Sequence, residues 1–310
     1  MRTDTNKHHA DLVAIGQALG LRAKSEVSLG ATGSYRPRLD VLWSLPLTKQ
    51  QRAATSAVGA RVPLFDSAIP IGAWEVESSD ASTKGMQADL ANMRMSGAFI
   101  SFLAPRGGTK DNLYERGIAL ERTQAHHFGQ RRVVVLDCAW IEELARVPLS
   151  SAASPFAVKE KAGSGGTGDW AKGVTQELTR RGTAAGFLVH PEYTRARSAA
   201  APTKSKIDLV WALPLPAGLA TFVKAIAKRA GQPDVETDGE YAAVPVVAFE
   251  IENCASKHGH GGLLNLASHA MCGVFAAGTS AAAEAAEGAK ATYCTAFPLA
   301  NVTIHKEFVQ

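Results

Sequence analysis

Apolar positions follow two different spacings along this chain, and the two spacings together predict a mixture of helices and strands. In residues 8–20 they recur every three or four positions, which is the spacing of one helix face. In residues 69–77 the second half alternates instead, so Glu75 and Glu77 share one face of a strand while apolar residues take the other. Both kinds of segment recur to the end of the chain.

The predicted elements follow the plan α-β-β-β-α-β in the second half, and the first half has a similar plan with two strands predicted before its second helix. In the first half we expect helices at 8–20, 82–96, 111–127 and 138–146, and strands at 38–45, 69–77, 98–103 and 132–136. In the second half we expect helices at 170–181 and 262–270, strands at 186–190, 206–213, 245–252 and 273–277, and an additional helix at 217–230. The predicted fold class is α/β with mixed α+β character: in each half a central mixed β-sheet flanked by helices.

Three peptide pairs indicate that the two halves are copies of one domain. They occur in the same order in both halves, at slowly drifting offsets of 168, 175 and 176 residues: LDVLWSLPL (39–47) and IDLVWALPL (207–215), PIGAWEVE (70–77) and PVVAFEIE (245–252), MSGAF (95–99) and MCGVF (271–275). We therefore predict a first domain at 1–150 and a second at 170–310. The segment between them, 151–169, is rich in Ser, Ala and Gly and is typical of a linker.

Composition and charge limit the choice of function. The net charge of +4 permits an anionic partner without requiring one, since a slightly basic cytosolic protein would look the same. The four cysteines lack paired spacing, which favours a reducing compartment. No secretory leader and no run of about 18 apolar residues is visible, so we expect a cytoplasmic protein without a membrane span.

The most distinctive polar feature is a set of acidic residues inside apolar strands. Each copy has one Asp in its LDVLW or IDLVW strand and a Glu-x-Glu pair in the strand after it: Asp40, Glu75 and Glu77, then Asp208, Glu250 and Glu252. Residues two apart in a strand point to the same face, so the two Glu of a pair project together. Neighbouring carboxylates repel unless a cation lies between them, and such oxygen ligands suit Mg²⁺ or Mn²⁺.

A solvated strand face is the alternative explanation for these acids, because half-exposed strands often carry them. The two copies differ at many surface positions yet keep the same three acids. A purely solvated face gives no reason for that agreement, so the repetition favours a metal site.

The stretches AFEIENCASKHGHGGLLNLASHA and GAWEVESSDASTKGMQADLANM, with the preceding Asp strands, resemble the PD-(D/E)XK superfamily of restriction-type endonucleases. The resemblance covers the core of both copies and implies two tandem restriction-endonuclease-like domains. It implies that Asp40, Glu75, Asp208 and Glu250 are metal ligands, and that Glu77 and Glu252 take the usual lysine position, as in a minority of the superfamily. A glutamate there must bind metal or act as a general base.

Basic residues precede each strand Asp and could position phosphate, although scattered surface charge would look alike. They are Arg36, Arg38, Arg195, Arg197, Lys204 and Lys206. Glu26 and Glu192 also occupy similar places in the two copies. They could be further acids of the sites, but we favour ordinary surface residues.

Two other signals are weaker. Lys84 and Lys257 follow the Glu-x-Glu strands and could supply the missing cation, but they do not align with each other. The group Cys254, His258, His260, His269 and Cys272 matches no standard zinc spacing and has no counterpart in the first copy.

The leading hypothesis is therefore an Mg²⁺- or Mn²⁺-dependent endonuclease that hydrolyses double-stranded DNA. The tandem copies could act as a monomer with an internal pseudo-dimer or as a homodimer. The alternative is a nuclease-like module that binds DNA or protein after losing catalysis in one or both copies. A structural domain that needs no metal is a third possibility.

Overall fold

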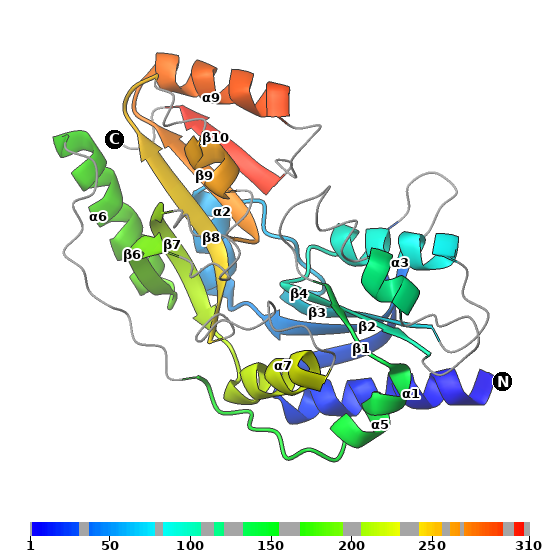
Figure 1. Cartoon of the computed structure of the whole chain (residues 1–310). Helices are drawn as coiled ribbons and strands as arrows, with labels where there is room; N and C mark the ends of the chain where they lie inside the picture. The colour runs from blue at the N-terminus through cyan, green and yellow to red at the C-terminus, as the bar shows by residue number, and fades with distance from the viewer. Residues whose placement is uncertain are drawn as a thin grey trace. The chain divides into compact units, whose positions relative to one another are not determined.

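The computed structural model describes residues 2–30, 37–77, 83–106, 115–120, 133–154, 168–194, 206–229, 242–255, 261–266, 270–293 and 301–306. These residues form two five-stranded mixed sheets flanked by helices (Figure 1). The predicted fold class, a mixed α+β chain with one mixed sheet in each half, is confirmed. None of the described helices is both long enough and apolar enough to cross a membrane.

The first sheet has the strand order β1-β2-β3-β4-β5. Its first three strands are antiparallel and its last three are parallel. The strands are β1 (Arg22–Ser28), β2 (Arg38–Pro46), β3 (Ala68–Glu77), β4 (Ile100–Pro105) and β5 (Val133–Val135). The helices of this half are α1 (Arg2–Ala18), α2 (Lys49–Ala57), α3 (Thr83–Met95), a helical segment at 115–120, a 3-10 turn (Cys138–Trp140) and α5 (Ile141–Leu144).

The second sheet repeats this plan, with the strand order β6-β7-β8-β9-β10 and the same division into antiparallel and parallel pairs. The strands are β6 (Leu188–Thr194), β7 (Lys206–Pro214), β8 (Ala243–Glu252), β9 (Cys272–Ala277) and β10 (Val302–Lys306). The helices are α6 (Asp169–Ala184), α7 (Ala217–Arg229), a helical segment at 261–266 and α9 (Ser280–Tyr293). A register shift falls at the same place in both copies, after the strand tryptophan.

The chain forms two compact units, and each unit takes one helix from the opposite half of the sequence. Unit 1 comprises Met1–Pro46, Leu64–Ser154 and Pro216–Tyr241, so it contains α7. Unit 2 comprises Leu47–Pro63, Pro155–Leu215 and Ala242–Gln310, so it contains α2. The helix predicted at 217–230 is therefore not an addition of the second copy, because α2 occupies the matching place between the second and third strands of the first.

The predicted domains, 1–150 and 170–310, differ from these units because Leu47–Pro63 belongs to unit 2 and Pro216–Tyr241 to unit 1. That the two domains arose by duplication remains a prediction. Most of the predicted linker, 155–167, lies outside the described residues. Just before it, the backbone N–H groups of Ala217 and Gly218 donate to the carbonyl oxygens of Ala152 and Ser150 within unit 1.

Aromatic packing fixes α7 in unit 1, where α1 and α7 lie along one face of the sheet and α3 along the other (Figure 1). Trp74 and Phe102 stack with ring centroids 4.0 Å apart. Phe222 of α7 contacts Trp43, Trp74 and Phe102 at centroid distances of 5.5, 6.1 and 6.2 Å. These rings are almost fully buried, so a helix from the second half completes the core of unit 1.

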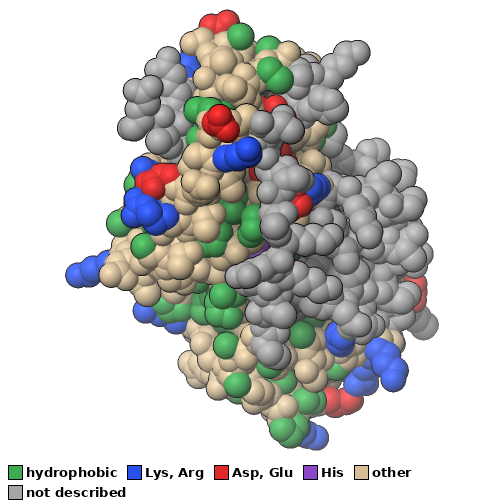
Figure 2. All heavy atoms as spheres, turned by 90° about the vertical axis from the view of Figure 1, so that its left-hand side faces the viewer, with side chains coloured by type: hydrophobic (Ala, Val, Ile, Leu, Met, Phe, Trp, Pro, Cys, Tyr) green, Lys and Arg blue, Asp and Glu red, His purple; other side chains and the backbone are tan. Residues whose placement is uncertain are grey.

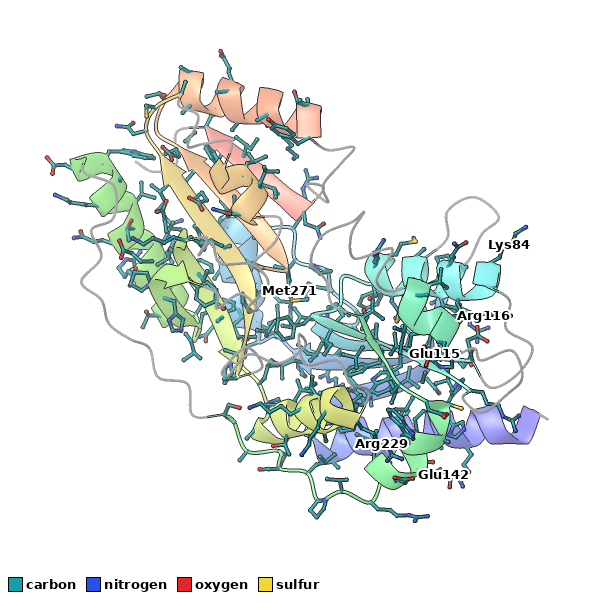
Figure 3. All side chains as sticks on the ribbon, in the orientation of Figure 1. Lys84, Glu115, Arg116, Glu142, Arg229 and Met271 are labelled. Carbon is teal, nitrogen blue, oxygen red and sulfur yellow. The ribbon has the colours of Figure 1, made fainter. Side chains whose placement is uncertain are left out.

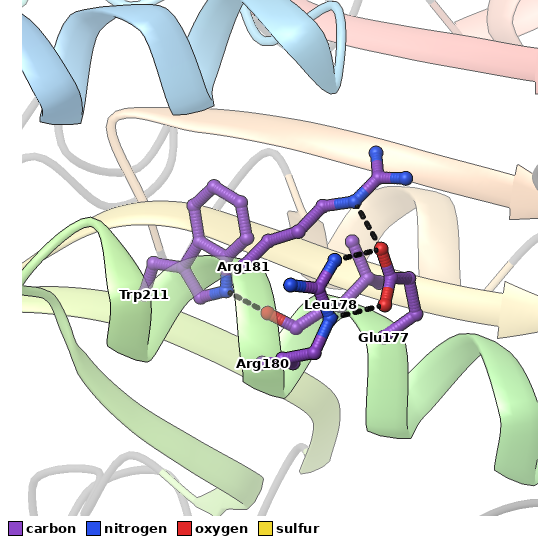
Figure 4. A network of polar contacts seen from close by, with 5 residues as sticks. All are labelled: Glu177, Leu178, Arg180, Arg181 and Trp211. Carbon is purple, nitrogen blue, oxygen red and sulfur yellow. Dashed lines mark hydrogen bonds and ion pairs between the residues drawn. The ribbon is translucent and has the colours of Figure 1, made fainter.

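The helix at the start of each copy packs against its sheet in the same way. The indole N–H of Trp43 donates to the Leu12 carbonyl at 2.9 Å, and that of Trp211 donates to the Leu178 carbonyl at 3.1 Å. Figure 4 shows the second contact, beside the ion pairs of Glu177 with Arg180 and Arg181. These paired contacts align α1 with α6 at an offset of 166 residues.

Candidate metal centre

The antiparallel pairing of β2 with β3 brings the predicted acids of the first copy together. Val41 pairs with Trp74, so Asp40, the residue before Val41 in β2, lies beside Glu75, the residue after Trp74 in β3. The second copy has the same register, since Leu209 pairs with Phe249 and leaves Asp208 beside Glu250. Both acidic groups occupy the same position in their sheets.

One hydrogen bond fixes the Asp in each copy. The backbone N–H of Val76 donates to Asp40 Oδ2 at 2.7 Å, and that of Ile251 donates to Asp208 Oδ2 at 2.8 Å. In each copy, the donor is the residue between the two Glu, and the acceptor is the Asp of the neighbouring strand. The Asp carboxylate is therefore held against the backbone of the Glu-x-Glu strand, between the two glutamates.

The first Glu of each pair is buried without adequate compensation. Glu75 is 5% exposed and Glu250 is 6% exposed, and Oε1 of each has no hydrogen-bond partner among the described residues. A buried carboxylate oxygen without a partner costs free energy unless the group is neutral or a cation is bound. An oxygen-only donor set of this kind fits a hard divalent cation, so the residues that are present fit the predicted Mg²⁺ or Mn²⁺.

The electrostatics of unit 1 lead to the same conclusion. Burial, followed by repulsion from Asp40, Asp89 and Glu77, raises the pKa of Glu75 to about 10. Burial and a hydrogen bond with Asp89 raise the pKa of Glu77 to about 8. Without a cation, the fold therefore favours protonated carboxyl groups here at neutral pH.

In unit 2 the carboxyl pKa values are also raised, but fewer acidic groups contribute. Burial and the neighbouring Asp208 raise the pKa of Glu250 well above its ordinary value. Burial also raises the pKa of Asp208, although hydrogen bonds to the Ile251 backbone and to Glu250 oppose the shift. The Asp208 and Glu250 side chains thus form a hydrogen-bonded carboxyl pair.

Asp89 is an acid of the unit 1 centre that the repeat comparison missed. It lies on α3, its pKa is raised by burial, and it shares a hydrogen bond with Glu77. The corresponding helix of unit 2 places Gly262 there instead: a Cβ on Gly262 would lie 3.1 Å from the Glu250 carboxyl carbon. Because Asp89 has no acidic counterpart in the second copy, the repeated acids do not reveal it.

Glu26 is exposed, as predicted for a surface residue, and Glu192 is partly buried; both lie beside the strand Asp of their copy. Their strands pair so that Glu26 lies opposite Asp40 and Glu192 opposite Asp208. Both have left-handed backbone conformations, with φ of 57° and 52°, which are rare for glutamate within a strand. Such strain persists only where the surrounding structure imposes it, and it often marks functional sites.

The described basic residues near the acids are ion-paired with these two glutamates. Arg38 contacts Glu26 Oε2, and Lys206 Nζ lies 2.7 Å from Glu192 Oε1. Arg36, Arg195, Arg197 and Lys204 lie outside the described residues. Among the described residues on the face drawn in Figure 2, basic side chains are interspersed with acidic ones.

The described residues give little support to a displaced lysine at the acidic centre or to a zinc site. Lys84 is exposed on α3 and points away from the sheet (Figure 3). Cys254 is exposed, whereas Cys272 is buried in β9 and donates its thiol to the Val246 carbonyl at 3.2 Å. Lys257 and the three histidines of the suggested zinc group lie outside the described residues.

Comparison of the chain with protein-family models, with curated proteins and with solved structures found no match.

Proposed function

We propose that this chain is a metal-dependent DNA endonuclease with one phosphodiester-hydrolysing centre in each copy. The observation that carries the proposal is the repeated burial of Glu75 and Glu250, each with an unpartnered oxygen beside a strand Asp. Two copies that differ elsewhere retain the same costly arrangement. A bound divalent cation would compensate both sites in the same way.

The side chains divide the work according to their positions. Asp40 and Glu75 in unit 1, and Asp208 and Glu250 in unit 2, would hold Mg²⁺ or Mn²⁺. The ion would polarise the scissile phosphate and lower the pKa of a bound water. Glu77 and Glu252 follow two residues later on the same strand face. A carboxylate there can bind the ion or accept a proton from the attacking water, but it cannot contribute a positive charge.

Double-stranded DNA is the proposed partner. Arg38 and Lys206 lie at the first position of β2 and β7, two residues before the strand Asp. If each exchanged its glutamate partner for a DNA phosphate, the sugar-phosphate backbone of the DNA would lie beside the acidic centre. We further propose that the chain acts in the cytoplasm, as a monomer with two pseudo-equivalent sites or as a homodimer. The four cysteines lack paired spacing in the sequence, which suits a reducing compartment.

A second possibility, for unit 2 alone, is a copy that binds DNA without cutting it. Gly262 replaces the acid that Asp89 supplies, and the Asp208 and Glu250 carboxyl groups hydrogen-bond to each other. This favours unit 1 as the more active centre.

Incubation of plasmid DNA with the full chain tests the proposal. We expect cleavage with Mg²⁺ or Mn²⁺, none with EDTA, and none for the double variant Glu75→Gln, Glu250→Gln. Glu115→Gln, an exposed substitution on the helical segment at 115–120, is the matched control and should cut normally. Cleavage that persists in EDTA or in the double variant would contradict the proposal.

A further inference from the structure

A histidine and two acids converge beside the acidic centre of unit 1, each from a different element. His9 comes from α1, Glu26 from β1 and Asp40 from β2. One ligand atom from each lies within 4.8 Å of the other two. His9 Nδ1 is 3.6 Å from Glu26 Oε1, and His9 Nε2 is 3.5 Å from Asp40 Oδ2.

His9 lies between these carboxylates without an ordinary hydrogen bond to either. Its two nitrogen–oxygen distances are longer than those of normal N–H···O bonds. The residue is 7% exposed, and its buried Nε2 has no hydrogen-bond partner among the described residues. Each imidazole nitrogen of His9 thus faces one carboxylate, and the buried, unpartnered Nε2 is available as a metal ligand.

Glu26 is oriented so that one oxygen faces this histidine. Arg38 contacts Oε2, which leaves Oε1 toward His9. Glu26 has a left-handed backbone conformation, with φ of 57°, and lies opposite Asp40 of the neighbouring strand. A non-glycine residue is disfavoured in this conformation, so packing elsewhere must hold it there.

We propose that His9, Glu26 and Asp40 form a second cation position in unit 1, which prefers Mn²⁺ or another transition metal to Mg²⁺. The preference follows from the imidazole nitrogen, since Mg²⁺ selects oxygen ligands and transition metals accept nitrogen. The inference rests on the proposed function in that Asp40 also belongs to the acidic centre. Asp40 would join the two positions, as a shared carboxylate does in two-metal hydrolytic sites.

Unit 2 offers no equivalent among its described residues. The matching contacts of Trp43 with Leu12 and of Trp211 with Leu178 place Thr175 at the position of His9. The Thr175 hydroxyl donates to the Ala171 carbonyl at 2.8 Å within its own helix. Unit 2 therefore has the carboxylates without the nitrogen ligand, and the two units should differ in metal content.

Electron spin-echo spectroscopy of the full chain loaded with Mn²⁺, in the presence of excess Mg²⁺, tests the site. We expect nitrogen modulation from a coordinated histidine in the wild type. His9→Thr, which introduces the residue of unit 2, should abolish the modulation and lower the Mn²⁺ count by one ion per chain. His8→Thr is the matched control, because His8 is the adjacent residue of α1 and is similarly buried; it should leave the modulation intact.

A second measurement needs no substitution. ¹⁵N-labelled histidine in the wild-type chain should change the modulation frequencies, as expected for direct coordination. Mn²⁺ bound without nitrogen modulation, or a modulation that survives His9→Thr, would overturn the inference even if the protein cuts DNA. Nitrogen modulation without any DNA cleavage would instead overturn the proposed function and support the cation site.

Discussion

Replacing Glu75 by Gln should stabilise the metal-free protein at neutral pH. The pKa of Glu75 is about 10 in the folded chain, against an ordinary value of 4.5. Because the folded pKa is the higher one, the stabilisation from the protonated carboxyl is complete below pH 4.5. It is lost progressively as the pH rises toward 10.

The magnitude follows from the pH interval. Each pKa unit is worth about 1.4 kcal/mol, so the 2.5 units between 4.5 and pH 7 correspond to about 3 kcal/mol of lost stability. Glutamine resembles the protonated carboxyl at every pH. Glu75→Gln should therefore exceed the wild type by about 3 kcal/mol at pH 7 in EDTA and match it near pH 4.

Urea unfolding in EDTA, followed by tryptophan fluorescence, measures this difference, since Trp43 and Trp74 are buried in unit 1. Glu115→Gln is the control and should change little, because Glu115 is exposed. Added Mn²⁺ should reverse the order, since the wild type gains from an ion bound through Glu75 and the variant lacks that ligand. A variant no more stable than the wild type at pH 7, or equally favoured at both pH values, would refute the reasoning.

The remaining predictions concern packing. Phe222→Ala should destabilise unit 1 by about 3–5 kcal/mol, because the ring fills the aromatic cluster. Phe222→Leu should cost less in the same urea titration, and an unchanged midpoint for the Ala variant would contradict the placement of α7. Gly182→Ala should cost about 1–3 kcal/mol, because its Cβ would lie 2.4 Å from Trp211 Nε1. A Cβ on Gly173, in the same helix, would meet nothing within 4 Å, so Gly173→Ala should raise the melting temperature through helix propensity. Equal effects of the two glycine substitutions would disprove the close approach of Gly182 to Trp211.

The sequence was sufficient to predict the buried strands but not the exposed elements. β2 and β3 are long apolar runs, and their core positions are evident from hydrophobicity. β1 reads RAKSEVS and is largely exposed, so it carries no alternation to detect. The polar helix α2, KQQRAATSA, was missed for the same reason. α9 and β10 were also not predicted.

The site was predictable only as far as the two copies agree. Asp40, Glu75 and Glu77 were found because the second copy repeats them. Glu26 also has a repeated partner, but its left-handed conformation cannot be deduced from residue type. His9 could not be predicted because its approach to Asp40 depends on how α1 docks on the sheet.

Plasmid cleavage by single-copy variants tests the central claim, two metal-dependent nuclease centres in one chain, most directly. With Mn²⁺, the wild type should convert supercoiled plasmid to the linear form. Asp40→Asn and Asp208→Asn should each leave mainly nicked circles, and the double variant should leave the plasmid supercoiled. Linearisation by the double variant, or supercoiled plasmid untouched by the wild type, would contradict the account.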